Sequence, residues 1–231
     1  MKDSVINIDT AILTHVLNTA IQAGIIDKNP CQNVKRLKVS QVKDRVLSSN
    51  EIATILSMPQ GKDKLMILIG LFTGARLNEV LSLKWNDIDF SKGIIHITQS
   101  KTGKVITIPL SGYLIDELTQ YMAMSNDGRV FEDADITRTI ISGYSAYFSN
   151  LFKGMGIHNF TFHNLRHTFS SILQSELGVG AVVVQGMTGH ASLSMLQKYS
   201  HSGLDSRQRA IQALTEHVLN ADKNTSKVIG L

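Results

Sequence analysis

Apolar residues near the N-terminus recur at the spacing of a helix that is buried along one face. Within residues 8–24 this stripe consists of Ile12, Leu13, Val16, Leu17, Ala20 and Ile21, and Gly24 follows as a stop signal. Asn29-Pro30 then breaks the pattern. Because a single helix cannot bury its own apolar face, we expect this segment to be the end of a larger domain that was cut or lost before residue 1.

A second series of helices begins near residue 47. Ser48 and Glu51 have the spacing of a capping box, which predicts a helix start. A strongly apolar helix is expected over residues 65–73, ending at Gly74, and a further helix over residues 77–83.

The spacing changes from that of a helix to that of a strand near residue 93. Two apolar segments, 93–99 and 105–109, flank Ser100-Lys101-Thr102-Gly103-Lys104 and predict a β-hairpin with Gly103 in its turn. Helical spacing returns after Pro109, over residues 111–123, 137–153, 163–176, 180–187, 192–200 and 204–219. The polar residues 221–231 predict a mobile tail. The whole pattern predicts an α+β fold that is mainly α, with a small antiparallel β-sheet.

Length and composition place the chain among ordinary globular proteins. Its 231 residues suffice for one good-sized domain, or for one domain and a fragment, and 43% of them are hydrophobic. Cys31 is the only cysteine, which excludes an intramolecular disulfide and a cysteine-based metal cluster. The sequence has neither an apolar run long enough to span a membrane nor a secretion signal, so we expect a cytoplasmic protein without a membrane partner.

The net charge of +4 and the pI of about 9.1 are mildly basic, and the basic residues are unevenly distributed. One short segment holds five of them with Asp44 as its only acidic residue: Lys35, Arg36, Lys38, Lys43 and Arg45. Such a run is typical of a solvated linker, but it also suits a segment that lies along DNA phosphates.

Several residues that could bind and attack a phosphate occur in separate segments. Arg76 follows Gly74 at an expected helix start, with Glu79 one turn further on. His163 and Arg166 lie one turn apart, so both can face one cleft. His190 follows a glycine, and Tyr199 comes nine residues later.

Cleavage of a phosphodiester without a metal needs a nucleophile, cationic donors for the non-bridging oxygens and an acid for the leaving oxygen. Arginine suits the second role because its guanidinium stays charged and can donate two parallel bonds to a phosphate. Tyrosine suits the first role, provided that cationic neighbours favour its phenolate, since its free pKa is near 10.

Each of these residues also has a more ordinary interpretation. Arg76 and Glu79 could form a surface ion pair, and His163 could be a hydrogen-bonded group at a helix end. Tyr199 shares a helix stripe with Leu193 and Leu196, which is typical of a packing residue. His167 lies one residue further around the helix, and we interpret it as structural.

The ordered set, in contrast, resembles the tyrosine recombinase (phage integrase) family over residues 46–201. The matching motifs are Thr73-Gly74-Ala75-Arg76-Leu77-Asn78-Glu79, the hairpin Ser100-Lys101-Thr102-Gly103-Lys104, His163-Asn164-Leu165-Arg166-His167, Thr188-Gly189-His190 and Tyr199-Ser200-His201. Thr188 stands where the family usually has leucine. The resemblance implies the fold of the DNA breaking-rejoining enzymes, a helical catalytic domain with a small antiparallel sheet, and a reaction that uses no metal and no cofactor.

The resemblance also implies a role for each matching residue. Tyr199 would be the nucleophile that forms a 3′-phosphotyrosyl link, and Arg76 and Arg166 would bind the non-bridging oxygens. Lys101 would protonate the leaving 5′-oxygen, with Lys104 on the same hairpin as the alternative. His163 would exchange a proton with the tyrosine, His190 would support the phosphate, and Glu79 would hold the architecture.

By the same resemblance, residues 1–34 are the C-terminal remnant of a core-binding domain and residues 35–46 a basic linker. Residues 47–220 would then be the catalytic domain, followed by the tail 221–231. Relatives of this kind have further helices ahead of residue 1, so the chain is either a shortened piece of such a protein or a degenerate gene product.

The function implied is site-specific DNA recombination by a bacterial or phage-encoded, DNA-associated protein. Its partners would be a double-stranded DNA attachment site and three further copies in a homotetramer on synapsed DNA, with a monomer when free and accessory DNA-bending proteins. We expect helix 204–219 to expose Ile211, Leu214 and Val218 and to dock on a neighbouring protomer. Two alternatives stay open: DNA relaxation like that of a type IB topoisomerase, and a prophage remnant that binds DNA without cutting it.

Overall fold

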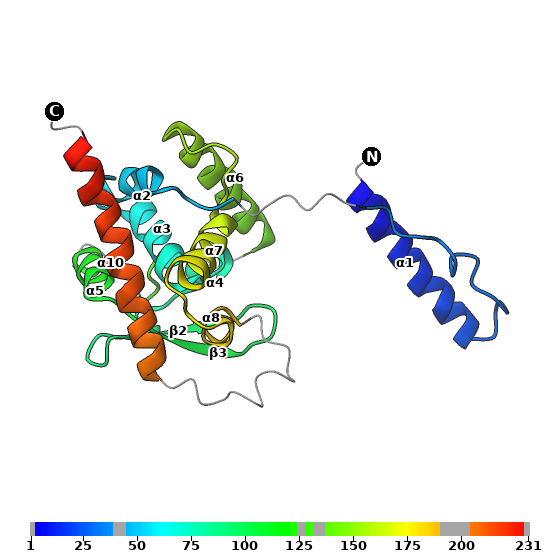
Figure 1. Cartoon of the computed structure of the whole chain (residues 1–231). Coiled ribbons are helices and arrows are strands. Elements are labelled where there is room, and N and C mark those ends of the chain that lie inside the picture. The colour runs from blue at the N-terminus through cyan, green and yellow to red at the C-terminus, as the bar shows by residue number, and fades with distance from the viewer. Residues whose placement is uncertain (1–2, 39–44, 124–127, 132–136, 190–203, 229–231) are drawn as a thin grey trace. The chain divides into compact units, whose positions relative to one another are not determined.

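The computed structural model describes residues 3–38, 45–123, 128–131, 137–189 and 204–228, and divides the chain into two compact units, Met1–Lys43 and Asp44–Leu231 (Figure 1). The expected helix 192–200 lies outside the described residues.

The first unit contains helix α1 (Asp3–Gln22), which begins at Asp3 rather than at residue 8. Two asparagines tie the following segment to it. Asn29 is buried and donates to the Thr14 carbonyl at 3.1 Å, and Asn7 exchanges two hydrogen bonds of 2.9 and 2.8 Å with the backbone of Leu37. Ile12 and Val16 on the apolar stripe of α1 are nevertheless 59% and 56% exposed, as expected for a helix with too little chain to cover it.

Helix α3 (Lys62–Thr73) is the centre of the second unit, and every residue of it from Lys64 to Thr73 is buried. Around it pack α2 (Ser49–Leu56), α4 (Leu77–Leu81), α5 (Gly112–Met122) and α7 (Phe162–Ser171). The predicted capping box at Ser48 and Glu51 is confirmed, with both of its hydrogen bonds present. Helix α6 (Arg138–Gly154) packs on α7 through aromatic side chains, of which Phe148 and Phe162 have ring centroids 5.0 Å apart.

A small antiparallel sheet forms one side of the second unit. Strands β2 (Ile94–Thr98) and β3 (Val105–Pro109) form the predicted hairpin, with Ile95 opposite Ile108 and Ile97 opposite Ile106. A third strand, β1 (Ile88–Asp89), pairs with β2 and follows the 3-10 turn η1 (Trp85–Asp87). Its two residues are too few to show a strand pattern in the sequence, whereas the mainly helical fold with a small antiparallel sheet is confirmed.

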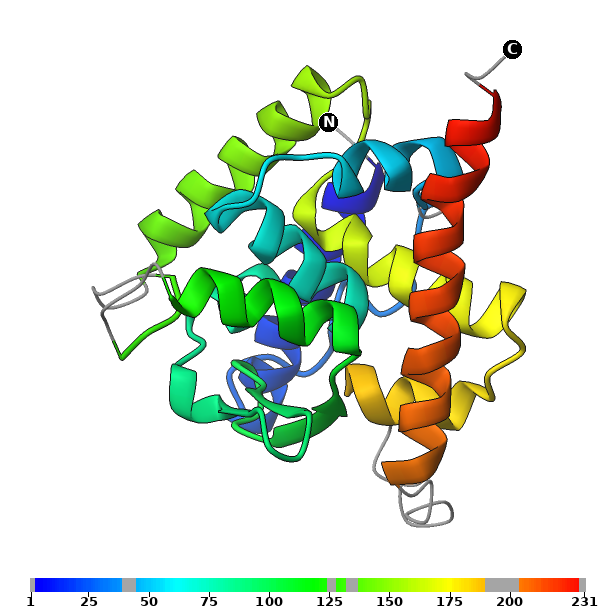
Figure 2. The same ribbon diagram turned by 90° about the vertical axis from the view of Figure 1, so that its left-hand side faces the viewer.

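Helix α10 (Leu204–Val228) lies along α2, α3, α8 (Ala181–Thr188) and β3 (Figure 2). Ile211, Leu214 and Val218 are at most 2% exposed, so the expectation that they face a neighbouring protomer is wrong. An amphipathic stripe shows only that a face is covered, and here the covering elements belong to the same chain. The helix also runs on to Val228, past the predicted end at residue 219.

Candidate active site

Arg76 is positioned by the short break between α3 and α4. Gly74 ends α3 in the left-handed conformation, with φ of +66°, and its N–H bonds to the Gly70 carbonyl at 3.0 Å. A methyl group at Gly74 would lie 2.8 Å from the Phe169 ring, so the position requires glycine for its space as well as for its backbone. Two residues later, Arg76 is the N-cap of α4.

The Glu79 carboxylate holds Arg76 through both the backbone and the side chain. One oxygen accepts from the Arg76 backbone N–H at 2.8 Å, and the other accepts from the Arg76 guanidinium at 2.8 Å. Glu79 is only 5% exposed, so the pair differs from an ordinary surface pair. Because both bonds end on one buried carboxylate, the direction of the Arg76 side chain is tied to the start of the helix.

Arg166 comes from the middle of α7 and is 3% exposed. Its Nη1 donates to the Gly74 carbonyl at 2.7 Å, and its Nη2 donates to the carbonyl of Thr188 at the end of α8. The guanidinium therefore connects the ends of α3 and α8, and the same turn that presents Arg76 also orients Arg166.

The two arginines are close enough to affect each other electrostatically. Burial and, to a lesser extent, the positive charge of Arg76 lower the pKa of Arg166, the negative charge of Glu79 partly offsets them, and the resulting pKa is about 10. Arg166 still carries its full charge at neutral pH. The arrangement thus concentrates positive charge at one point, which is the property needed to bind a phosphodiester and to stabilise charge on its oxygens.

His163 lies one turn before Arg166 on α7, and its side chain is exposed. Its ring meets that of His167 edge to face, with centroids 4.8 Å apart. A capping box starts this helix, since Asn164 Oδ1 accepts from both the backbone N–H and the hydroxyl of Thr161 at 2.8 Å. This cap sets the direction in which the first turn presents His163.

The hairpin turn between β2 and β3 carries both candidate lysines, Lys101 and Lys104, and both are exposed. The Gln99 carbonyl accepts from the N–H groups of Thr102 at 3.3 Å and Gly103 at 2.8 Å, and the Gln99 N–H bonds to the Lys104 carbonyl at 2.8 Å. This geometry does not favour one lysine over the other as the acid. It does identify Gln99, which we did not single out from the sequence, as the residue on which the turn is built.

His190 and Tyr199 lie outside the described residues. The segments before and after them are described. α8 ends at Thr188, with Gly189 in the left-handed conformation at φ of +72°. In the first turn of α10, Arg207 donates to the Thr107 carbonyl of β3 at 2.8 Å.

The predicted phosphate-contacting residues divide between the two units. Lys35, Arg36 and Lys38 are exposed in the first unit, and Lys43 lies outside the described residues. Arg45, in the second unit, forms an ion pair with Glu51, donates to the Val46 carbonyl and lies over the Phe160 ring at 5.7 Å. Its guanidinium thus holds the start of α2 in place.

The part of the chain described here contains no cluster of three His, Cys, Asp or Glu side chains able to hold a metal ion. No helix among those residues is long and apolar enough to cross a membrane.

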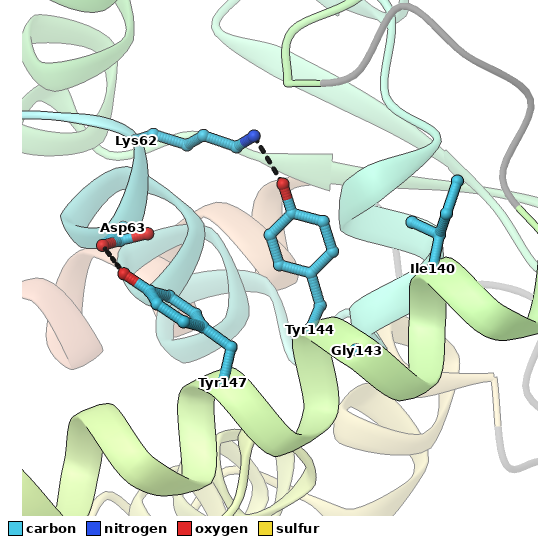
Figure 3. A pocket seen from close by; sticks show the side chains of 6 residues that line it. All are labelled: Lys62, Asp63, Ile140, Gly143, Tyr144 and Tyr147. Carbon is cyan, nitrogen blue, oxygen red and sulfur yellow. Dashed lines mark hydrogen bonds between the residues drawn. The ribbon is translucent and has the colours of Figure 1, made fainter.

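A pocket of about 530 Å³ lies between α3 and α6, lined by none of the candidate residues (Figure 3). Across it Lys62 donates to the Tyr144 hydroxyl, and the Tyr147 hydroxyl donates to Asp63. Because none of the candidate residues lines this pocket, we take the arginine pair as the candidate active site.

The chain is similar to known proteins over most of its length. The profile of the Phage integrase family matches residues 45–204, more than half of the chain. A shufflon-specific DNA recombinase of Escherichia coli is 29% identical over 218 residues, which are 90% of this chain and 55% of that protein. A tyrosine recombinase of Pseudothermotoga lettingae is 32% identical over 187 residues, which are 77% of this chain and 63% of that protein. The chain thus spans 55% and 63% of the length of these two relatives.

Solved structures show the same fold. The Tn1549 transposon integrase in complex with circular intermediate DNA matches with a TM-score of 0.68 at 23% identity, covering 90% of this chain and 78% of that one. A lambda integrase tetramer bound to a Holliday junction matches with a TM-score of 0.63 at 22% identity, covering 80% and 58%. The match of the family profile to the segment that carries Arg76, the hairpin and Arg166 leads to one conclusion: the chain belongs to the phage integrase family.

Proposed function

We propose that this chain is the catalytic part of a site-specific DNA recombinase that cleaves and rejoins DNA through a 3′-phosphotyrosyl intermediate. Family membership supports the proposal, and the relatives are named recombinases. The observation that carries it is the arginine pair: Arg166 donates to the carbonyl of Gly74, two residues before Arg76, although the two arginines come from helices far apart in the sequence.

In the proposed reaction, the phenolic oxygen of Tyr199 forms a bond to the scissile phosphorus while the bond from phosphorus to O5′ breaks. The phenolic proton passes to His163, and Lys101 gives a proton to O5′, which leaves as a 5′-hydroxyl. Attack by the 5′-hydroxyl of another strand reverses these steps and rejoins the DNA. No ATP is needed, because one phosphodiester bond is exchanged for another.

In this mechanism the two guanidiniums bind the non-bridging oxygens, and His190 supports the same phosphate. Arg166 is already fixed by the carbonyls of Gly74 and Thr188, and Arg76 by Glu79. Donors that are fixed before the substrate binds need no reorganisation in the transition state, and this preorganisation is the largest single term in many enzymes.

The proposed partners are a double-stranded attachment site and further copies of the chain. The lambda integrase tetramer on a Holliday junction supports a tetramer on synapsed DNA. The proposal also includes a monomer when the chain is free of DNA. The proposal includes accessory DNA-bending proteins, a cytoplasmic location and contacts from Lys35, Arg36, Lys38 and Lys43 to phosphates. The names of the relatives favour recombination over DNA relaxation and over binding without cleavage.

The test is a covalent trap that does not require the attachment site to be known. The full chain is incubated with a pool of duplexes of randomised core sequence, each nicked so that the cleaved 5′-hydroxyl fragment diffuses away. We expect an adduct that survives denaturing electrophoresis, with the DNA fragment attached to the peptide that contains Tyr199. Absence of an adduct overturns the proposal.

Three variants test the assigned roles. Tyr199→Phe should form no adduct, and an adduct with this variant would contradict the assignment of the nucleophile. Arg166→Lys keeps the charge but not the planar pair of donors, so cleavage should fall by about 10²- to 10³-fold. Tyr147→Phe, a tyrosine on α6 that lines the separate pocket, is the matched control and should react like the parent chain.

A further inference from the structure

Gln99 is a buried polar residue at the point where β2 enters the lysine-bearing turn. It is 5% exposed and continues the inward face of β2 after Ile95 and Ile97, where an apolar side chain would be expected. A buried amide is costly unless it is hydrogen-bonded, so its partners indicate why it stands here.

The two ends of the Gln99 amide bond to different parts of the site. Its Nε2 donates to the Thr188 carbonyl at 3.3 Å, and its Oε1 accepts from the Thr102 hydroxyl at 3.1 Å. The Thr188 carbonyl is the same one that accepts from Arg166. One carbonyl oxygen with two lone pairs thus holds both the guanidinium of the phosphate site and the side chain at the base of the lysine turn.

Gly189 brings the backbone into direct contact with this amide. A methyl group at Gly189 would lie 1.9 Å from Gln99 Nε2. The Gln99 amide therefore packs on the backbone immediately before His190 and contacts the α8 terminus at two successive residues.

We propose that Gln99 is a positioning residue that fixes the lysine turn relative to Arg166 and to the residue preceding His190. The inference rests on the proposed function, because it concerns the acid of that reaction. General acid catalysis depends on the distance between the acid and the leaving oxygen, and an exposed lysine in a turn has no fixed place of its own. Gln99 links the turn to the Thr188 carbonyl, which also orients the phosphate-binding arginine, and thereby fixes the position of the turn.

The test changes the leaving group of the substrate. This change distinguishes a loss of acid positioning from a general loss of folding. Duplexes that the parent chain cleaves in the covalent trap are remade with sulfur in place of the bridging 5′-oxygen at the scissile phosphate. A thiolate leaves readily without a proton, so cleavage of this substrate does not depend on the acid. Lys101→Ala serves as the benchmark for loss of the acid.

For Gln99→Met, which keeps the length of the side chain, we expect cleavage of the ordinary duplex to fall by about 10- to 100-fold and that of the sulfur duplex by less than about 3-fold. An equal loss on both substrates would mean that Gln99 only supports the fold, and would overturn the inference. A parent chain that cleaves neither substrate would overturn the proposed function itself, so the two failures are distinct.

A second set of variants carries the test if Gln99→Met does not fold. Thr102→Val, at an exposed position, removes the hydroxyl that donates to Gln99 Oε1 and also accepts a longer bond of 3.4 Å from the Lys104 N–H within the turn. It should show the same preference for the sulfur substrate, and Thr102→Ser should restore the parent ratio. Thr98→Val changes an exposed threonine at the end of β2 and is the matched control. The same preference in Thr98→Val, or its absence in Thr102→Val, would contradict the role of Gln99.

Discussion

Alanine at Gly189 would place a methyl group where the Gln99 amide lies. The added carbon would be 1.9 Å from Gln99 Nε2, far inside any allowed contact, and φ at this position is +72°. Two separate costs follow. The backbone would hold an L-residue in the left-handed region, and the Gln99 side chain would have to leave the Thr188 carbonyl.

The expected loss is the sum of these two terms. The left-handed conformation costs alanine roughly 1–2 kcal/mol. Displacing a buried amide from its acceptor costs about 1–3 kcal/mol. The free energy of unfolding should therefore fall by roughly 2–5 kcal/mol in Gly189→Ala, and cleavage should fall with it.

Gly178→Ala is the matched control for the backbone term. Gly178 has φ of +64°, and a methyl group there would meet no atom within 4 Å. This variant should lose only about 1–2 kcal/mol. The effect of alanine on the unfolded chain is common to both variants and cancels in the comparison.

Urea unfolding of the two variants, of Gln99→Ala and of the double variant Gly189→Ala/Gln99→Ala gives the coupling between the two positions. In the double variant the clash is absent, so the combined loss should be smaller than the sum of the single losses by at least about 1 kcal/mol. Equal losses in Gly189→Ala and Gly178→Ala, together with additivity, would refute the contact between Gln99 and Gly189.

Three further predictions concern stability. Lys64 and Glu117 form a buried ion pair at 3.0 Å, so Lys64→Met should cost about 3–5 kcal/mol in chemical unfolding, and Lys64→Met/Glu117→Leu should recover most of it; no recovery would contradict the pairing. Deleting residues 204–231 removes the large buried side chains of Ile211, Leu214 and Val218, worth about 5–9 kcal/mol, and circular dichroism should show an unfolded catalytic unit; a folded one would contradict the packing of α10. Burial raises the pKa of Glu51, but hydrogen bonds from Arg45 and Ser48 outweigh it and hold the pKa below 4.5. The difference in the free energy of unfolding between the parent chain and Glu51→Gln should thus be constant above pH 4.5 and shrink as the pH falls below 4.5. A difference that grows on acidification would contradict the lowered pKa.

Local signals in the sequence were sufficient for the hairpin and for the start of α2. The alternation around Gly103 and the spacing of Ser48 and Glu51 report interactions within a few residues, and the structure confirms both. The direction of the α10 stripe could not be predicted in the same way. An apolar stripe does not show which surface covers it. The main covering element of α10 is α2, which lies near the start of the unit in the sequence.

For the candidate site, the sequence predicts individual residues but not the hydrogen-bond network that connects them. Spacing indicates that Glu79 can reach Arg76, but its burial depends on how α3, α6 and β2 pack on α4. Gln99 carried an unused signal: it is a polar residue at an inward position of a strand whose preceding inward residues are isoleucines. A buried polar side chain needs a hydrogen-bond partner, but only the fold shows that this partner is the Thr188 carbonyl.

The carbonyl bonds of Arg166 and Gln99 also determine when the site can form during folding. Arg166 bonds to a residue 92 positions away, and Gln99 to one 89 positions away. Contacts between such distant residues form late, because a long loop has to close before they contribute. During synthesis, the arginine pair and the lysine turn cannot be locked together until α8 has left the ribosome. A nascent or partly folded chain therefore lacks the assembled arginine site, so under the proposed function an incomplete copy of the protein does not cleave DNA.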